Sequence, residues 1–173
     1  MTDRADDLRR AFDRAFAEPP PAAPAASEDL LMIRLAGDPY ALRLRDVAGL
    51  LASRKVVAVP ADAPGLLGLA GVRGDLVPVF DLTALIGRGA LADPPRWLVL
   101  CGDGERVGLA FPVLEGHLRV ARTDLHHGAA PTAASRHIDG LVRTDAGVRP
   151  VVAIPSILAT IRHHRARPGA PED

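Results

Sequence analysis

The chain has 173 residues and no net charge, because 21 Lys and Arg residues balance 21 Asp and Glu residues. Hydrophobic residues make up 48% of the chain, enough for a buried core, but only 3% of residues are aromatic, so the core must be mainly aliphatic. The zero net charge argues against a general nucleic-acid binder, which needs a basic face for the phosphates.

The first 27 residues differ in pattern from the rest of the chain. Leu8, Phe12 and Phe16 recur every four residues and predict a short helix over residues 1–17 with a narrow apolar stripe. Residues 18–27 include three consecutive prolines, which remove backbone donors and favour an extended linker. We therefore predict a helical appendage and linker over 1–27, dispensable for the folding of a domain that spans 28–163.

The first part of that domain is typical of short β-strands. We expect them at 30–35, 40–45, 56–59, 68–72 and 76–80, with a hairpin turn at 73–75. Pro78 within the last strand indicates a sheet edge or a bulge. Asp81 is placed to cap a short helix over 82–85, which Gly87 ends.

The second part repeats this order of elements. We expect strands at 97–101, 107–111, 118–120, 138–142 and 148–154, and a loop over 121–136. Ser156 is expected to cap a last helix that carries Ile157, Leu158 and Ile161, and residues 164–173 are expected to form a disordered tail.

The two halves also match in detail. Residues 31–42 resemble 98–109, and residues 76–85 resemble 148–157, in the placement of apolar residues, glycine and proline. About ten strands in two similar sets predict an all-β fold of two small barrels, each of which closes its own edges.

Cys101 bears on the cellular compartment. It lies in an apolar run, has no other cysteine to pair with, and is expected to be a buried small apolar residue. A free thiol and the lack of a signal peptide indicate a reducing cytoplasm. No apolar run reaches the ~18 residues that a membrane-spanning helix needs, so we expect any membrane association to go through a partner.

Residues 68–82 carry a recognisable motif. They read Gly-Leu-Ala-Gly-Val-Arg-Gly-Asp-Leu-Val-Pro-Val-Phe-Asp-Leu and resemble the CheW-domain signature, roughly G-x-x-N-x-R-G-x-x-v-P-v-x-D-L. Only the Asn is missing, because position 71 is Gly. Residues 40–47, 59–67 and 106–109 resemble other segments of the CheW family, in order and at the family spacing. The resemblance covers about residues 29–161.

This resemblance implies two SH3-like five-stranded β-barrels with an apolar seam, together with short helices. It implies a non-enzymatic adaptor of chemotaxis signal transduction, which binds the cytoplasmic tip of a methyl-accepting chemoreceptor and the regulatory domain of a CheA-type histidine kinase. Such a protein is cytoplasmic and is recruited to receptor arrays at the inner membrane. The alternative is a diverged CheW-fold binding module in another chemosensory-like pathway, such as pilus motility. Neighbouring genes would discriminate the two.

The leading candidate for partner binding is Arg73. A guanidinium at a hairpin tip, with Gly71, Val72 and Gly74 around it, can form forked bonds to a carboxylate or to backbone carbonyls. The alternative is an ordinary solvated turn arginine.

A second candidate is the apolar stretch that contains Val47 and Leu50, which we expect to line a groove for a receptor helix. The alternative is a place in the core. The family often has Glu where this chain has Gly49, so we expect a contact that is more apolar and less sensitive to salt. Pro112 and Val152-Ala153 also replace acidic positions of the family.

Signals for chemistry are missing from the sequence. There is no phosphate loop, G-x-G-x-x-G, G-x-S-x-G, H-E-x-x-H or C-x-x-C, and the histidine pairs at 126–127 and 163–164 lack metal-ligand spacing. Ser135, His137 and Asp139 lie too close in sequence to be persuasive as a triad. We therefore expect no catalytic residue, no cofactor and no metal.

Overall fold

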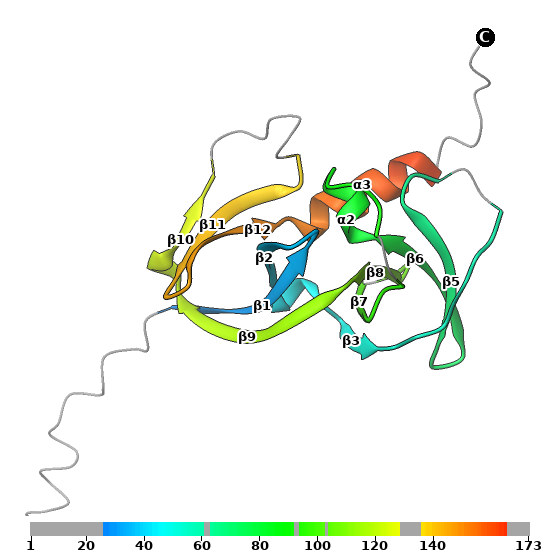
Figure 1. The fold of residues 1–173 in the computed structure, drawn as a ribbon, viewed down its shortest axis with the longest axis horizontal. Helices are drawn as coiled ribbons and strands as arrows, with labels where there is room; N and C mark the ends of the chain where they lie inside the picture. Colours follow the sequence, from blue (N-terminus) through cyan, green and yellow to red (C-terminus); the bar gives the residue numbers. More distant parts are fainter. Residues whose placement is uncertain (1–25, 61–62, 92–93, 103, 129–135, 166–173) are drawn as a thin grey trace, which may run out of the picture.

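The computed structural model describes residues 26–60, 63–91, 94–102, 104–128 and 136–165 (Figure 1). The predicted N-terminal helix lies outside these residues, as do nearly all of the linker and the end of the C-terminal tail. No helix within the described ranges is long and apolar enough to span a membrane.

In the part of the chain that the structure describes, twelve strands form two six-stranded sheets, which lie side by side in Figure 1. Sheet A, on the left, has the order β10-β11-β12-β2-β1-β9, and sheet B, on the right, has the order β3-β7-β8-β6-β5-β4. Sheet A contains β1 (Ser27–Leu35), β2 (Asp38–Arg43), β9 (Val113–Ala121), β10 (Leu125–His127), β11 (Ile138–Thr144) and β12 (Gly147–Val152). Sheet B contains β3 (Gly49–Ala52), β4 (Val56–Val57), β5 (Leu66–Val72), β6 (Asp75–Asp81), β7 (Trp97–Cys101) and β8 (Val107–Phe111).

The predicted all-β class and the pair of similar strand sets are confirmed, but each sheet has six strands where we expected five. The two additional strands are β3 and β10, which are short. β10 lies in the segment that we expected to be a loop, and its three residues become a strand through pairing with β11, with Leu125 opposite Val142. A strand of this length has too few residues for its alternation to be visible in the sequence.

Each sheet is assembled from both halves of the chain. The hairpin β1–β2 joins the later strands β9–β12, and the equivalent hairpin β7–β8 joins the earlier strands β3–β6. The parallel contacts that complete the exchange are equivalent, because Val151 lies opposite Ala41 in sheet A and Val79 lies opposite Gly108 in sheet B. We expected each half of the sequence to form its own set of strands. Two similar sets are present, but each one takes a hairpin from the other half of the sequence.

The core has three parts. One cluster is formed by strands of sheet A around Leu30 and Val142, and another is formed by strands of sheet B around Val72 and Val79. The largest cluster lies between the sheets and includes Phe111, as well as residues of both hairpins and both helices. Because each fully buried aliphatic or aromatic side chain contributes about 1.5–3 kcal/mol, this shared cluster holds the sheets together as one body.

The helices follow equivalent strands. α2 (Leu82–Leu85) follows β6, and α3 (Ile154–Arg165) follows β12; two 3₁₀ turns, η1 (Leu44–Asp46) and η2 (Arg122–Asp124), lie between strands. The predicted cap of α2 is confirmed, since Oδ1 of Asp81 accepts hydrogen bonds from the backbone N–H groups of Thr83, at 2.8 Å, and Ala84, at 3.2 Å.

The start and end of α3 differ from our expectation. The helix begins at Ile154, so Ser156 lies in its first turn and is not its cap. Ser156 Oγ is instead 2.9 Å from Nδ1 of His137, which ties the first turn of α3 to the segment before β11. The helix ends at Arg165, so it includes the first two residues of the segment that we expected to be a tail.

Pro78 lies where sheet B leaves room for it. The ladder between β6 and β8 begins at Val79, so Pro78 precedes it and is paired in register with Leu69 of β5. Pro150 occupies the same place in β12, because the contact of β12 with β2 begins at Val151. Both prolines thus fit the edge-like part of an interior strand, as proline requires.

Candidate functional site

Arg73 lies at the tip of the β5–β6 hairpin. Val72 pairs with Asp75, so the turn consists of Arg73 and Gly74, and both have positive φ, 54° and 92°. Two central residues with positive φ are typical of a type I′ turn, whose twist matches that of the flanking strands. A non-glycine residue in this conformation costs about 1 kcal/mol or more. The turn presents Arg73 and Gly74 to solvent, as predicted.

The outer face of the same hairpin is apolar. Val57 of β4 is 56% exposed and Leu76 of β6 is 73% exposed. With Leu69 and Gly71 they line a shallow hollow of about 450 Å³, which Arg54 and Lys55 border. We call Val57, Leu69, Gly71 and Leu76 the hairpin patch.

Val57 and Leu76 were not predicted to be surface residues. The alternation along β6 could have revealed Leu76, because Val77 and Val79 face the core. Of the predicted site residues, Gly71 belongs to the hairpin patch, and nothing lies within 4 Å of the Cβ that another residue would add there. Val72 does not reach this surface, because its side chain is 1% exposed and packs inside sheet B.

Val47 lines a groove between η1 and α3. The groove has a volume of about 390 Å³, and Val47, Ala48, Ile154, Pro155 and Leu158 provide its apolar wall. Arg45, Asp46 and Arg162 also line it. We call it the Val47 groove. Val47 itself is half-buried and packs against the central core, and its predicted contact with a partner stays a prediction.

Leu50 does not line this groove. It lies on β3, is 37% exposed, and pairs in register with Val99 of β7. Val47 and Leu50 therefore do not line the same groove, because strand pairing begins at Gly49, and a binding role for Leu50 stays a prediction. A Cβ at Gly49 would lie 3.4 Å from Cδ1 of Leu100.

Charged groups give the Val47 groove a mixed character. Burial raises the pKa of the Asp46 carboxyl, and Nε of Arg45 lies 3.9 Å from its Oδ1. Arg45 also lies 3.3 Å from Glu28, while Arg162 is exposed on α3. Two guanidinium groups therefore accompany the apolar wall, in addition to the largely apolar contact that we predicted.

A charged cluster that was not predicted lies inside sheet A. Arg43 is only 2% exposed; its Nε lies 3.0 Å from Oε1 of Glu28, and its Nη1 bonds to the carboxylate of Asp139. The alternation along β2 could have revealed this burial, because Arg43 lies on the same face of the strand as Ala41 and pairs in register with Leu30. The pattern was ambiguous because Arg45, two residues further on, is also an arginine and is exposed.

The side chains in the described residues that could be reactive are buried or bonded to other residues of the fold. Burial raises the pKa of the Cys101 thiol to about 12, so it stays protonated at neutral pH. Burial, with a smaller effect of Arg136, lowers the pKa of His137. Asp139 is bound by Arg43, and Ser135 of the weak triad lies outside the described residues. No group of three potential metal ligands occurs within the described ranges.

Comparison with known proteins agrees with this architecture. The family model described as CheW-like domain matches residues 29–163. Among solved structures, the crystal structure of the scaffolding protein TtCheW from Thermoanaerobacter tengcongensis has a TM-score of 0.66 and 18% identity, over 73% of this chain and 89% of that one. At that identity it shows a shared fold. No curated protein matches in sequence. Because the family model spans most of the chain, including the Arg73 hairpin and both sheets, the protein belongs to the CheW-like domain family.

Proposed function

We propose that the protein is a non-enzymatic scaffold that couples chemoreceptors to a CheA-type histidine kinase in bacterial chemotaxis. The observation that supports this proposal is that one body carries an exposed apolar patch and, apart from it, a groove with an apolar wall. The hairpin patch lies on the outer face of sheet B, and the Val47 groove lies between η1 and α3. A coupling protein needs two such surfaces, and the central core joins them.

The Val47 groove is the proposed site for the receptor tip. A receptor tip is a helical hairpin, and a helix laid in a groove is held by apolar anchors with polar groups at the rim. Val47, Ile154 and Leu158 supply the apolar wall, and Arg45 and Arg162 supply the charges.

The hairpin patch is the proposed site for the kinase regulatory domain. Leu76 and Val57 are large exposed apolar side chains, and Leu76 lies on the hairpin that carries the exposed Arg73 at its tip. Arginine is enriched among the residues that dominate binding energy at interfaces. Binding at both surfaces would place the protein at receptor arrays beneath the inner membrane. If the chain serves another pathway, such as pilus motility, the same surfaces would bind the receptor and kinase of that pathway.

The test is binding of the purified chain to the receptor tip and to the kinase regulatory domain from the same cell, by calorimetry. Val47→Asp should abolish receptor binding and leave kinase binding intact, whereas Arg73→Glu should weaken kinase binding by a few kcal/mol if it is a central, charge-paired anchor. Val113→Asp and Arg143→Glu are matched controls, since both replace exposed residues outside the two surfaces.

Three outcomes would contradict the proposal. The wild-type chain could fail to bind either partner, Val47→Asp could unfold the domain, or the control variants could weaken binding as strongly as the test variants. Circular dichroism of each variant separates unfolding from loss of a contact.

A further inference from the structure

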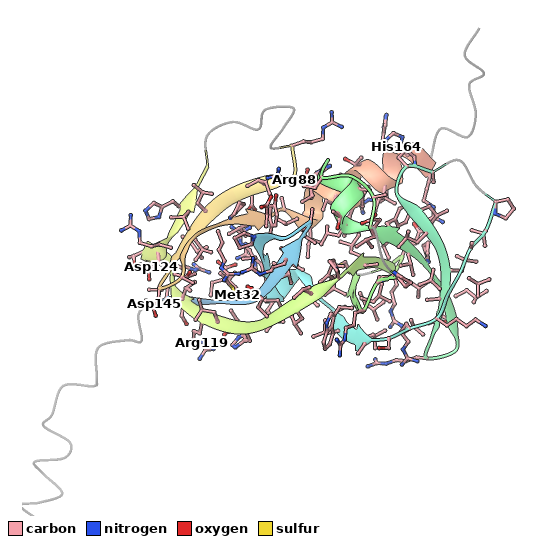
Figure 2. All side chains as sticks on the ribbon, in the orientation of Figure 1. Met32, Arg88, Arg119, Asp124, Asp145 and His164 are labelled. Carbon is pink, nitrogen blue, oxygen red and sulfur yellow. The ribbon has the colours of Figure 1, made fainter. Side chains whose placement is uncertain are left out.

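A second groove lies on the side of the molecule that carries α2. It consists of two adjoining hollows that share Ala84, Leu85, Arg136 and His137. The inner hollow, between α2 and α3, has a volume of about 140 Å³, and the outer one, between the end of α2 and β11, has a volume of about 520 Å³. We call the two together the α2 groove. Arg88 and His164, which lie at its outer and inner ends, are both on the upper side of the molecule in Figure 2.

The inner hollow is the size of one aromatic side chain. Phe80, Leu85 and Ile161 give it an apolar wall. An apolar cavity of about 150 Å³ in a protein is large enough to bind benzene. A single phenyl group therefore fits the inner hollow, while the rest of its ligand would have to lie in the outer one.

The charges around the α2 groove have one sign. Every ionisable side chain in its lining, apart from the phenol of Tyr40, is an arginine or a histidine, whereas the Val47 groove contains Asp46. Two of the arginines are partly offset, because Arg88 lies 3.2 Å from Asp38 and Arg165 bonds to Glu105. Arg136 lines both hollows at the point where they join, so its charge acts on both.

We propose that the α2 groove binds an acidic segment of another protein, with an aromatic side chain in the inner hollow and neighbouring carboxylates on Arg136 and Arg88. This proposal goes beyond the coupling function and does not depend on it. A peptide is favoured over a small free acid, because the enclosed hollow opens into an outer one more than three times its volume. A chain with one aromatic anchor and flanking carboxylates occupies both.

The test uses the full chain, labelled with ¹⁵N, and a nine-residue peptide of Gly and Ser with a central Phe between two pairs of Glu. Titration should give saturable amide shifts centred on Leu85, His137 and Ile161. Arg136→Glu should weaken binding about 10- to 100-fold, the loss expected for a charged hydrogen bond. Arg143→Glu, an exposed arginine on β11 outside the groove, should leave affinity within about twofold of the wild type.

Two further arms test the aromatic anchor. A peptide with Ala in place of Phe should lose binding, and Thr160→Trp, which adds bulk at the wall of the inner hollow, should block the original peptide. The proposal is overturned if no saturable shift appears, if the shifts centre on the Val47 groove or the hairpin patch, or if both arginine variants weaken binding equally. It is also overturned if 3-phenylpropionate alone binds as tightly as the peptide, since the site would then take a small acid.

Discussion

Sheets A and B share one topology but enclose different interiors. By the equivalence of their hairpins, Arg43 of β2 corresponds to Ala110 of β8, since each lies opposite an equivalent leucine, Leu30 and Leu98. Sheet B is filled by aliphatic side chains, and sheet A holds the charged cluster of Arg43, Glu28 and Asp139 at one end. The same strand order therefore accommodates an interior that is apolar throughout or one that carries a charged cluster at one end.

The largest expected difference between the sheets is the effect of removing Arg43. Arg43→Ala would remove the buried cation between Glu28 and Asp139 and leave Glu28 with only the exposed Arg45, so it should lower the free energy of unfolding by about 3–5 kcal/mol in urea denaturation. Arg43→Met combined with Glu28→Gln keeps the volume and removes both charges, and should recover part of that loss. A loss below about 1 kcal/mol for Arg43→Ala would mean that the cluster is not structural.

A smaller difference is expected at the two helix starts. Asp81 precedes α2, and the equivalent Ala153 precedes α3. Asp81→Ala removes acceptors for Thr83, Ala84 and Leu91, and should cost about 1–2 kcal/mol of unfolding free energy.

Ala153→Asp is the reciprocal variant, and it places a carboxylate before the longer helix. It should change the free energy of unfolding by less than about 1 kcal/mol, because α3 already forms without such a cap. Equal losses for the two variants would show that the helix starts do not differ in this way.

The turn η1, which connects the two sheets, should carry a pH dependence through Asp46. Because burial raises its folded pKa, the folded state holds the Asp46 proton more tightly than the unfolded state does. Asp46 therefore favours folding below its unfolded pKa, and this advantage is lost as the pH rises through the folded pKa. Asp46→Asn should be more stable than the wild type at neutral pH, and the gap should close on acidification. Parallel pH profiles for the two proteins would contradict this.

The smallest effect is expected on the outer face of sheet B. Gly71→Asn restores the family residue at an exposed position with open space for a side chain, and Arg143 already occupies the equivalent position in sheet A. The unfolding free energy should change by less than about 0.5 kcal/mol. A larger loss by thermal denaturation would show that this backbone requires glycine.

The local elements could be predicted because their signals are local. The strand that contains Tyr40 and Leu42, the cap at Asp81 and the turn at Arg73 each depend on a few neighbouring residues, and all three are present in the structure. The candidate site was predictable only in part. Arg73 and Gly71 were found from the motif, whereas the place of Val72 in the core and the exposure of Val57 depend on which face each strand turns outward.

The sequence by itself determined the all-β class, ten of the twelve strands in the described residues, the internal repeat and the resemblance to the CheW family. Only the tertiary structure decided that the hairpins exchange between the two halves, that Val47 and Leu50 belong to different surfaces, and that Arg43 lies inside a sheet. Two equivalent hairpins present nearly the same apolar pattern to either set of strands, so the pattern does not specify which set each one joins. That choice depends on contacts between distant segments, because the central core is buried only when both halves contribute to it.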